Sequence, residues 1–193
     1  MTEPSKNIEI VVAPGQLADR RTAEELIQRA LAARDMTGGL VSSVTDSGEV
    51  IVVPGAGVPA DLEGHDSVVR VDFGQCPPDR SDGIRAHIRG RGLDGLRFAI
   101  DSVYFHRFHP AETIEYGPHR EQRVELRVPD GDGPFPVAVL IHGGYWRSRW
   151  EFDLMDSMAV DLTARGYATW NVEYRRPDEH GWGTMTDDVA AAF

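Results

Sequence analysis

The stretch "VAVLIHGGYWRSRWE", Val137 to Glu151, is the part of the sequence that best defines a fold. An unbroken apolar run, Val137 to Ile141, stops at a histidine, two glycines and two aromatic residues. A short apolar run that ends in glycines is typical of a buried strand leading into a sharp turn, because glycine accepts backbone conformations that other residues avoid. We therefore predict a buried strand followed by a glycine-rich corner.

The segments around this corner alternate between strand and helix patterns. The expected elements are strands at 122–129 and 167–175 and helices at 151–166 and 184–193. Strands that alternate with helices favour a parallel sheet. Thr184 or Thr186 is the expected N-cap of the last helix. Glu173 and Arg175 are expected to form structural ion pairs near the end of their strand.

This part of the chain resembles a known family. From "EYGPHREQRVELRVP" through the corner to "GYATWNVEYRRPDEHGWGTMTDDVAAAF", it is similar to the early part of α/β-hydrolase-fold serine esterases. The similarity is greatest to the branch with carboxylesterases, dienelactone-hydrolase-like proteins and kynurenine-formamidase-like enzymes. It covers about residues 112–193. The resemblance implies an α/β fold whose C-terminal side is an incomplete α/β-hydrolase sheet.

The resemblance also implies roles for the corner. In this family such a loop supplies backbone N–H groups to an oxyanion hole, which stabilises the negative charge that develops on a substrate carbonyl oxygen. Carried over to this chain, the donors are the amides of Gly143, Gly144 and Tyr145. His142 is then a structural residue that holds the loop by hydrogen bonds. Tyr145 and Trp146 are expected to line the acyl pocket or to pack beneath it.

The catalytic triad is not identifiable in the 193 residues. The nucleophilic serine of this fold lies in a G-x-S-x-G motif, and the sequence contains none. We therefore expect a hydrolase domain truncated before the nucleophile, whose intact form would hydrolyse a small carboxylic ester or amide through a Ser-His-Asp/Glu triad. The alternative is a non-catalytic remnant or a binding module. An incomplete sheet exposes an edge, so the expected protein partner is a second copy or a complementing chain.

The pattern of the first half of the sequence predicts a separate small α+β domain at residues 1–108, whose role is unknown. The expected order is β-α-β-β-(β)-α-β, for which a ferredoxin-like arrangement is one candidate. The first helix has Thr22 as its expected N-cap. The remaining expectations are a hairpin from "LVSSV" and "EVIVV" around "TDSG", a helix at 79–92 and a strand at 96–105.

The periodicity breaks at the histidines and prolines between the two halves. We place the domain boundary near 105–115, so that 109–193 forms the hydrolase part. The first half resembles no family that we recognise.

The composition argues against several classes of partner. The sequence has 31 acidic residues (Asp and Glu) and 20 basic residues (Lys and Arg), which gives a formal charge of −11. This charge disfavours nucleic acid and anionic membrane surfaces as partners. No segment approaches about 18 consecutive apolar residues, and the amino terminus has no apolar signal core. We expect a cytoplasmic protein with no membrane partner.

The sequence context of the other notable polar residues indicates structural roles and not catalytic or metal-binding ones. Cys76 is the only cysteine, so it forms no internal disulfide, and we expect a structural thiol. His106 and His109 lack the carboxylate pattern of a metal site, and no metal or other cofactor is predicted. Asp187 and Asp188 are consecutive on the expected helix and diverge, which favours a capping or surface role.

Overall fold

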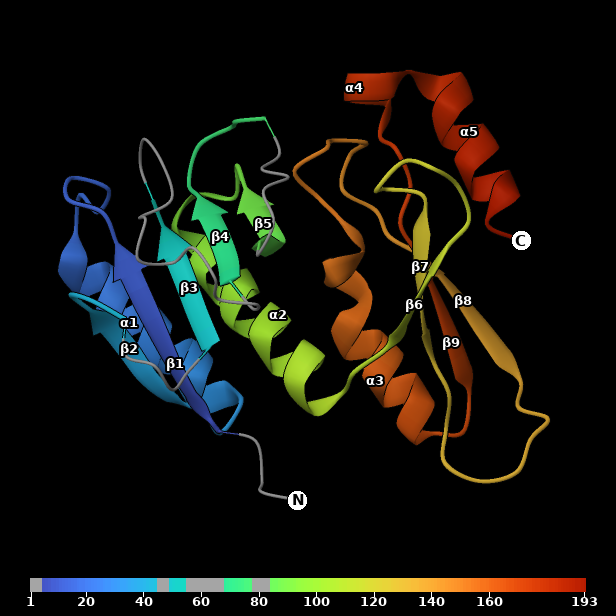
Figure 1. Ribbon diagram of the computed structural model, residues 1–193, viewed down its shortest axis with the longest axis horizontal. Coiled ribbons are helices and arrows are strands. Elements are labelled where there is room, and N and C mark those ends of the chain that lie inside the picture. The colour runs from blue at the N-terminus through green and yellow to red at the C-terminus, as the bar shows by residue number, and fades with distance from the viewer. Residues whose placement is uncertain (1–4, 45–48, 55–67, 78–83) are drawn as a thin grey trace. The chain divides into compact units, whose positions relative to one another are not determined.

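The structure is a computed structural model with a mixed α/β fold and two separate sheets. It describes residues 5–44, 49–54, 68–77 and 84–193. The chain divides into two compact units, Met1–Phe108 and His109–Phe193, and each unit contains one of the sheets (Figure 1). None of the helices in the described ranges combines the length and the apolar character needed to cross a bilayer.

Among the described residues, the sheet of the first unit has five parallel strands in the order β2-β1-β3-β4-β5. The strands are β1 (Asn7–Val12), β2 (Thr37–Val41), β3 (Glu49–Val53), β4 (Val68–Asp72) and β5 (Ile84–Arg89). Parallel neighbours need a crossover connection, and α1 (Arg20–Ala33) provides the one between β1 and β2. After β5, the short 3-10 turn η2 (Gly92–Asp94) leads into α2 (Gly95–Phe108).

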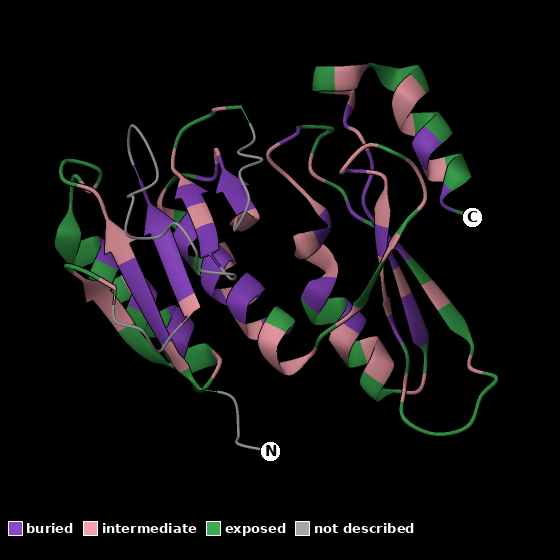
Figure 2. Ribbon diagram, viewed as in Figure 1, coloured by how far each residue is buried: buried purple, intermediate pink, exposed green. Residues whose placement is uncertain are grey.

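Both helices pack on one face of this sheet and form its main core with the strands (Figures 1 and 2). The inward residues of each helix recur every three or four positions, as an amphipathic helix requires. The buried core residues are Ala23, Ile27, Ala30 and Leu31 of α1, Leu96, Ala99, Ile100 and Val103 of α2, and Ile8, Ile10, Ile51, Val53, Val69, Val71 and Ile88 of the strands.

The expected hairpin and the ferredoxin-like arrangement are wrong, because both require antiparallel neighbours. β2 and β3 do not pair with each other, and each pairs in parallel with β1. Consecutive residues of β1, from Ile8 to Ile10, are buried, which is typical of a strand covered on both faces inside a parallel sheet. The turn expected at 45–48 lies outside the described residues.

Two other expectations for the first unit are wrong because tertiary contacts override local pattern. Residues 84–89 form a strand, not a helix, and its buried polar side chains find partners: the His87 imidazole contacts Asp72 (2.8 Å), and Arg89 donates to the carbonyl of Cys76 (3.1 Å). Residues 95–108 form a helix, not a strand, since its apolar residues cover the core at helical spacing despite their β-branched and aromatic character.

The N-cap of α1 is Asp19 and not Thr22. The Asp19 carboxylate accepts hydrogen bonds from the Thr22 backbone N–H (3.2 Å) and hydroxyl (2.5 Å). A carboxylate satisfies an otherwise unpaired amide of the first turn, as the threonine was expected to do one turn later.

The sheet of the second unit has four strands in the order β6-β7-β9-β8. β7 is antiparallel to β6 and β9, whereas β8 is parallel to β9, so the sheet is mixed and not parallel throughout as predicted. The elements are β6 (Glu112–Glu115), β7 (Arg123–Arg127), β8 (Val137–Ile141), η3 (Phe152–Met155), α3 (Asp156–Ala164), β9 (Ala168–Val172), α4 (Pro177–His180) and α5 (Trp182–Ala191).

The strands and helices predicted around the corner are confirmed, although their bounds differ. Strands form within 122–129, 137–141 and 167–175, a helix forms within 151–166, and another overlaps most of 184–193. The N-cap of α5 is Gly181, and neither Thr184 nor Thr186 takes that position, because the helix begins earlier, at Trp182.

The two faces of the second sheet are covered unequally. On one face, Ala192 at the end of α5 packs against Val124 and Val172, and the Trp170 indole N–H donates to the Ala192 carbonyl (2.9 Å). The opposite face carries η3 and α3, where the Asn171 amide donates to a carbonyl of η3 (3.1 Å). Alternate residues of β9 therefore serve different faces.

The α5 face is open over β8. Val137, Val139 and Ile141 pair in register with alternate β9 residues whose side chains point to the α5 face, so they point the same way. Their exposed fractions are 62%, 43% and 46%, and only Leu140 of β8 is buried. The prediction that this strand is buried is therefore wrong, because no described element of the unit covers this face of β8. β8 is also an edge strand of this sheet, so an apolar face and an unpaired edge coincide.

Candidate functional site

The corner after β8 has a strained backbone. Gly144, Tyr145 and Trp146 all have positive φ angles, of 127°, 53° and 57°. A Cβ at Gly144 would lie 2.5 Å from the Cβ of Trp150, so both the backbone and the packing require glycine there. Positive φ at two consecutive non-glycine residues costs free energy, and residues strained in this way cluster at functional sites.

The corner leaves its backbone donors uncommitted. Within the described part of the chain, no acceptor is hydrogen-bonded to the N–H groups of Gly143, Gly144 or Tyr145. The loop is nevertheless closed on itself, because the Arg147 N–H donates to the Gly144 carbonyl (3.1 Å). Three successive amides are therefore held in a defined loop and remain able to bind an oxygen acceptor.

These amides border a pocket of about 280 Å³. It is lined by His142, Gly143, Gly144, Tyr145, Trp146 and Tyr174. Tyr145 is 88% exposed and Trp146 53% exposed, and the Trp146 ring lies 5.2 Å from that of Trp182. The structure thus brings every site residue that the sequence predicted to one pocket, and adds Tyr174.

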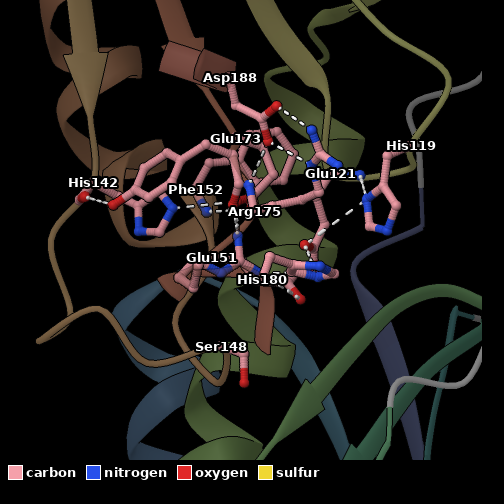
Figure 3. Close-up of polar contacts among 12 residues, drawn as sticks. His119, Glu121, His142, Ser148, Glu151, Phe152, Glu173, Arg175, His180 and Asp188 are labelled. Carbon is pink, nitrogen blue, oxygen red and sulfur yellow. Dashed lines mark hydrogen bonds and ion pairs between the residues drawn. The ribbon is translucent and has the colours of Figure 1, made fainter. Parts of the chain in front are cut away.

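His142 lies buried beneath the loop. Its Nδ1 is 2.8 Å from the Gly143 carbonyl. Its Nε2 is 3.2 Å from Oε1 of Glu173 (Figure 3). The imidazole stacks on the ring of Tyr174, with 4.6 Å between ring centres, and the Tyr174 hydroxyl donates to the His142 carbonyl (2.7 Å). Both ring nitrogens face oxygen atoms, so the side chain is fully engaged in holding the loop.

Glu173 is the centre of the buried network under the corner. Its carboxylate accepts hydrogen bonds from the N–H groups of Phe152 (2.9 Å) and Tyr174 (2.8 Å) and pairs with Arg176. Burial raises the pKa of Glu173, but the charges of Arg176 and His142 and these hydrogen bonds outweigh it and lower the pKa to about 2. Glu173 therefore holds a fixed negative charge below the loop.

The far end of the loop is held by α4. The Asp178 carboxylate accepts the Ser148 N–H through both oxygens (2.9 and 3.1 Å). Together with the contacts of Glu173 and Tyr174, this anchors the chain at His142, Ser148 and Phe152. The conformation of the corner is thus determined by residues that follow β9.

Arg176 connects Glu173 to a second buried carboxylate. It donates to Oε1 of Glu121 (2.9 Å) and lies 4.0 Å from Glu151. Burial lowers the pKa of Arg176, but the surrounding carboxylates raise it well above its usual range. Burial raises the pKa of Glu121 to about 7 despite Arg176, and burial and Glu173 raise the pKa of Glu151. One guanidinium therefore serves several carboxylates.

A parallel network fixes α5. The Asp188 carboxylate accepts hydrogen bonds from the backbone and side chain of Arg175 and from the Gln122 amide (2.8 Å). The expected surface or capping role is wrong for Asp188, which is 1% exposed, because Arg175 neutralises it in the interior. Its neighbour Asp187 is exposed, as expected. The structural pairs predicted for Glu173 and Arg175 form, with Arg176 and Asp188 as partners.

Two groups of side chains in the described ranges combine ligand types that bind metals. Asp72, Cys76 and His87 form one, and His119, Glu121 and His180 form the other. In the first group, Asp72 contacts His87 (2.8 Å) and Arg70 (2.6 Å), and burial raises the pKa of the Cys76 thiol. A thiol that resists ionisation is a poor ligand and nucleophile, which agrees with the structural role expected for Cys76.

Sequence reasoning missed most residues that support the corner. Asp178, Arg176 and His180 follow β9 in the charged stretch "RRPDEH", and Glu121 lies in the turn before β7. The available signal was their position, because ligands and catalytic loops gather beyond the carboxyl ends of parallel strands such as β8 and β9.

A strand of a mixed sheet that ends in His-Gly-Gly, with uncommitted amides beside a pocket, is an arrangement of the α/β-hydrolase-like esterase group. A comparison with protein families agrees: residues 125–193 match the family model BD-FAE, which belongs to this group. The match begins within β7 and includes the whole corner, Glu173 and Arg176, but not Glu121. No curated protein matches the chain.

Proposed function

We propose that residues 109–193 form the oxyanion-hole region of a serine esterase with the α/β-hydrolase fold. The substrate class is a small carboxylic ester or an amide such as a formamide, as in the carboxylesterase, dienelactone-hydrolase-like and kynurenine-formamidase-like branch. The observation that carries the proposal is the set of three uncommitted amides at Gly143, Gly144 and Tyr145 on the rim of a pocket.

The chemistry of acyl transfer explains why these amides matter. Attack on a carbonyl carbon moves negative charge onto the carbonyl oxygen, and donors that already point at that oxygen stabilise the transition state without reorganising. In hydrolases of this fold, one such donor comes from the loop between the third strand and the following helix. Here β8 is the third strand of its unit, and the corner leads through η3 into α3.

In this proposal His142 is a positioning residue and not the general base. A base needs a ring nitrogen that can reach the nucleophile, whereas both nitrogens of His142 face oxygen atoms inside the protein. Its exposed neighbours Tyr145 and Trp146 contact the acyl group of the substrate. Tyr174 forms the floor of the pocket below them.

The nucleophile of the proposed enzyme lies outside the 193 residues, since none of their serines is in a G-x-S-x-G motif. We place the nucleophile strand beside β8. That edge is unpaired in the sheet order β6-β7-β9-β8. The apolar side chains of Val137, Val139 and Ile141 are exposed on the same strand. A serine at the end of a strand next to β8 would meet the corner amides.

The first test is the nucleotide sequence downstream of the Phe193 codon, translated in all three frames. We expect a G-x-S-x-G motif followed by an acidic residue and a histidine. The chain extended to include them should hydrolyse nitrophenyl acetate or an aryl formamide, and a serine-directed phosphonate should abolish that turnover. If no such motif follows, or if the extended chain is inert, the esterase proposal fails and the remnant or binding alternative takes its place.

A further inference from the structure

The side chains of His119, Glu121 and His180 converge from two parts of the second unit. His119 and Glu121 lie in the loop between β6 and β7, and His180 is the last residue of α4. Both imidazoles are turned toward the Glu121 carboxylate (Figure 3). Nδ1 of His119 lies 3.9 Å and Nε2 of His180 lies 3.6 Å from Oε2 of Glu121, and the ring centres are 5.1 Å apart.

The two oxygens of Glu121 have different surroundings. Oε1 accepts a hydrogen bond from Arg176 (2.9 Å). Oε2 is buried, and no hydrogen-bond donor in the described part of the chain reaches it, although Glu121 is only 5% exposed. A buried carboxylate oxygen without a partner is costly, so a cation bound at this oxygen would stabilise the fold.

The two histidines can supply nitrogen ligands beside that oxygen. Nδ1 of His119 accepts the N–H of Glu121 at 3.3 Å, a hydrogen bond that coordination of a metal by this nitrogen would replace. Two ligand atoms bound to one tetrahedral zinc ion lie about 3.4 Å apart. The observed separations of 3.6 and 3.9 Å exceed this value only slightly. Both histidine side chains are partly exposed, at 23% and 27%, and have room to adjust.

We propose that His119, Glu121 and His180 bind a zinc ion. Two imidazole nitrogens and one carboxylate oxygen are a ligand set that zinc accepts, with a fourth position for water. Imidazole ligands disfavour magnesium and calcium, which prefer oxygen. The proposal does not depend on the esterase function, because it rests on this cluster alone.

A zinc ion in this position would brace the candidate site. It would tie the β6–β7 loop to α4, the helix whose Asp178 holds the Ser148 N–H in the corner. Because Glu121 is hydrogen-bonded to Arg176, and Arg176 pairs with Glu173, the ion would also be connected to the network below the corner. We therefore expect zinc to stabilise the second unit as a whole.

The test is a zinc titration of the purified, metal-stripped 193-residue chain by calorimetry, with cobalt(II) absorbance as a second readout. We expect one equivalent of zinc and a tetrahedral cobalt spectrum. Zinc should raise the urea midpoint measured by tryptophan fluorescence, which reports on the second unit because all four tryptophans (146, 150, 170 and 182) lie in it. Magnesium should leave the midpoint unchanged.

Matched variants locate the ion. His119→Ala and His180→Ala should each weaken zinc binding at least about tenfold, the usual effect of disturbing a metal site. His106→Ala, outside both clusters, and His87→Ala, in the other cluster, should bind zinc as the parent does. If circular dichroism shows that an alanine variant is unfolded, the corresponding glutamine variant replaces it.

The proposal is overturned by any of three results. The parent chain binds no zinc, both His119 and His180 variants retain the parent affinity, or His87→Ala removes the zinc while the His180 variant keeps it. Since none of these measurements involves catalysis, they fail or succeed independently of the esterase assay.

Discussion

At the scale of single residues, the corner after β8 distinguishes between two adjacent glycines. Gly144 has a positive φ of 127°, which residues with a side chain rarely adopt. A Cβ at this position would also clash with Trp150. Gly143 has no heavy atom within 4 Å of an added Cβ. The same substitution should therefore destabilise the protein at Gly144 and have little effect at Gly143.

We predict that Gly144→Ala lowers the free energy of unfolding by about 1–3 kcal/mol, through backbone strain and overpacking against Trp150. Gly143→Ala should change it by less than about 0.5 kcal/mol, as an exposed substitution without steric conflict does. Urea unfolding followed by tryptophan fluorescence measures both. Equal effects of the two variants would mean that the strained turn does not form.

The ionisation of Glu173 makes the stability of the second unit depend on pH in the acidic range. Its pKa of about 2 in the folded protein lies below the ordinary glutamate value of 4.5, so its ionised form favours the folded state. That contribution is fully present above about pH 4.5 and is lost as the pH falls toward 2. A difference of this size corresponds to roughly 3 kcal/mol.

We predict that unfolding free energy measured between pH 5 and pH 2 falls less steeply in Glu173→Gln than in the parent chain. The variant should also be less stable at neutral pH, because Arg176 loses a buried partner. Glu112→Gln, which changes an exposed glutamate on β6, should keep the parental slope. An unchanged slope in Glu173→Gln would assign the acid dependence to other carboxylates.

At the scale of elements, α5 is attached to the second sheet by one buried carboxylate. Asp188 accepts hydrogen bonds from Arg175, in the segment after β9, and from Gln122, just before β7. At the end of the helix, Ala192 packs against Val124 and Val172, and its carbonyl accepts the indole N–H of Trp170. Asp188 therefore fixes the position of α5 in the fold.

We predict that Asp188→Asn lowers the free energy of unfolding by about 1–3 kcal/mol, since the buried amide no longer offers a charged acceptor to Arg175 and Gln122. Asp187→Asn, one residue away on the exposed side of the helix, should change it by less than about 0.5 kcal/mol. Denaturant titrations of the two variants make the comparison. A similar effect at both positions would contradict the anchoring role.

The elements also show how far the sequence alone could lead. Around the corner, strand and helix patterns agreed with the tertiary structure, since Leu140 of β8 and the apolar residues of β9 had no competing interpretation. The first unit was harder. Its α2 is built from β-branched and aromatic residues, and its β5 buries His87 and Arg89 against partners that no local pattern reveals.

The candidate site was predictable only where it is local. The corner residues are contiguous, so a motif contains them. Glu121, Arg176 and Asp178 reach the corner from other loops, and no spacing rule connects them to His142. Strand pairing has the same limit, because β2 and β3 are consecutive in sequence but are separated by β1 in the sheet.

At the scale of the whole molecule, the second unit presents one apolar surface that its own elements do not cover. Val137, Val139 and Ile141 are exposed on the α5 face of β8, and β8 is an edge strand of the sheet. Unpaired edges with apolar side chains template association with another strand. In a preparation that contains only these 193 residues, the available strand belongs to a second copy.

We predict that the purified chain self-associates as its concentration rises and that Val139→Lys suppresses this association, because a charge on an edge strand blocks the approach of a second strand. Val128→Lys is the matched control, since Val128 is 53% exposed but follows β7 and is not on the edge. Sedimentation velocity over a range of concentrations separates the two variants. If both behave alike, association has another cause, and the edge of β8 is not the surface that completes this sheet.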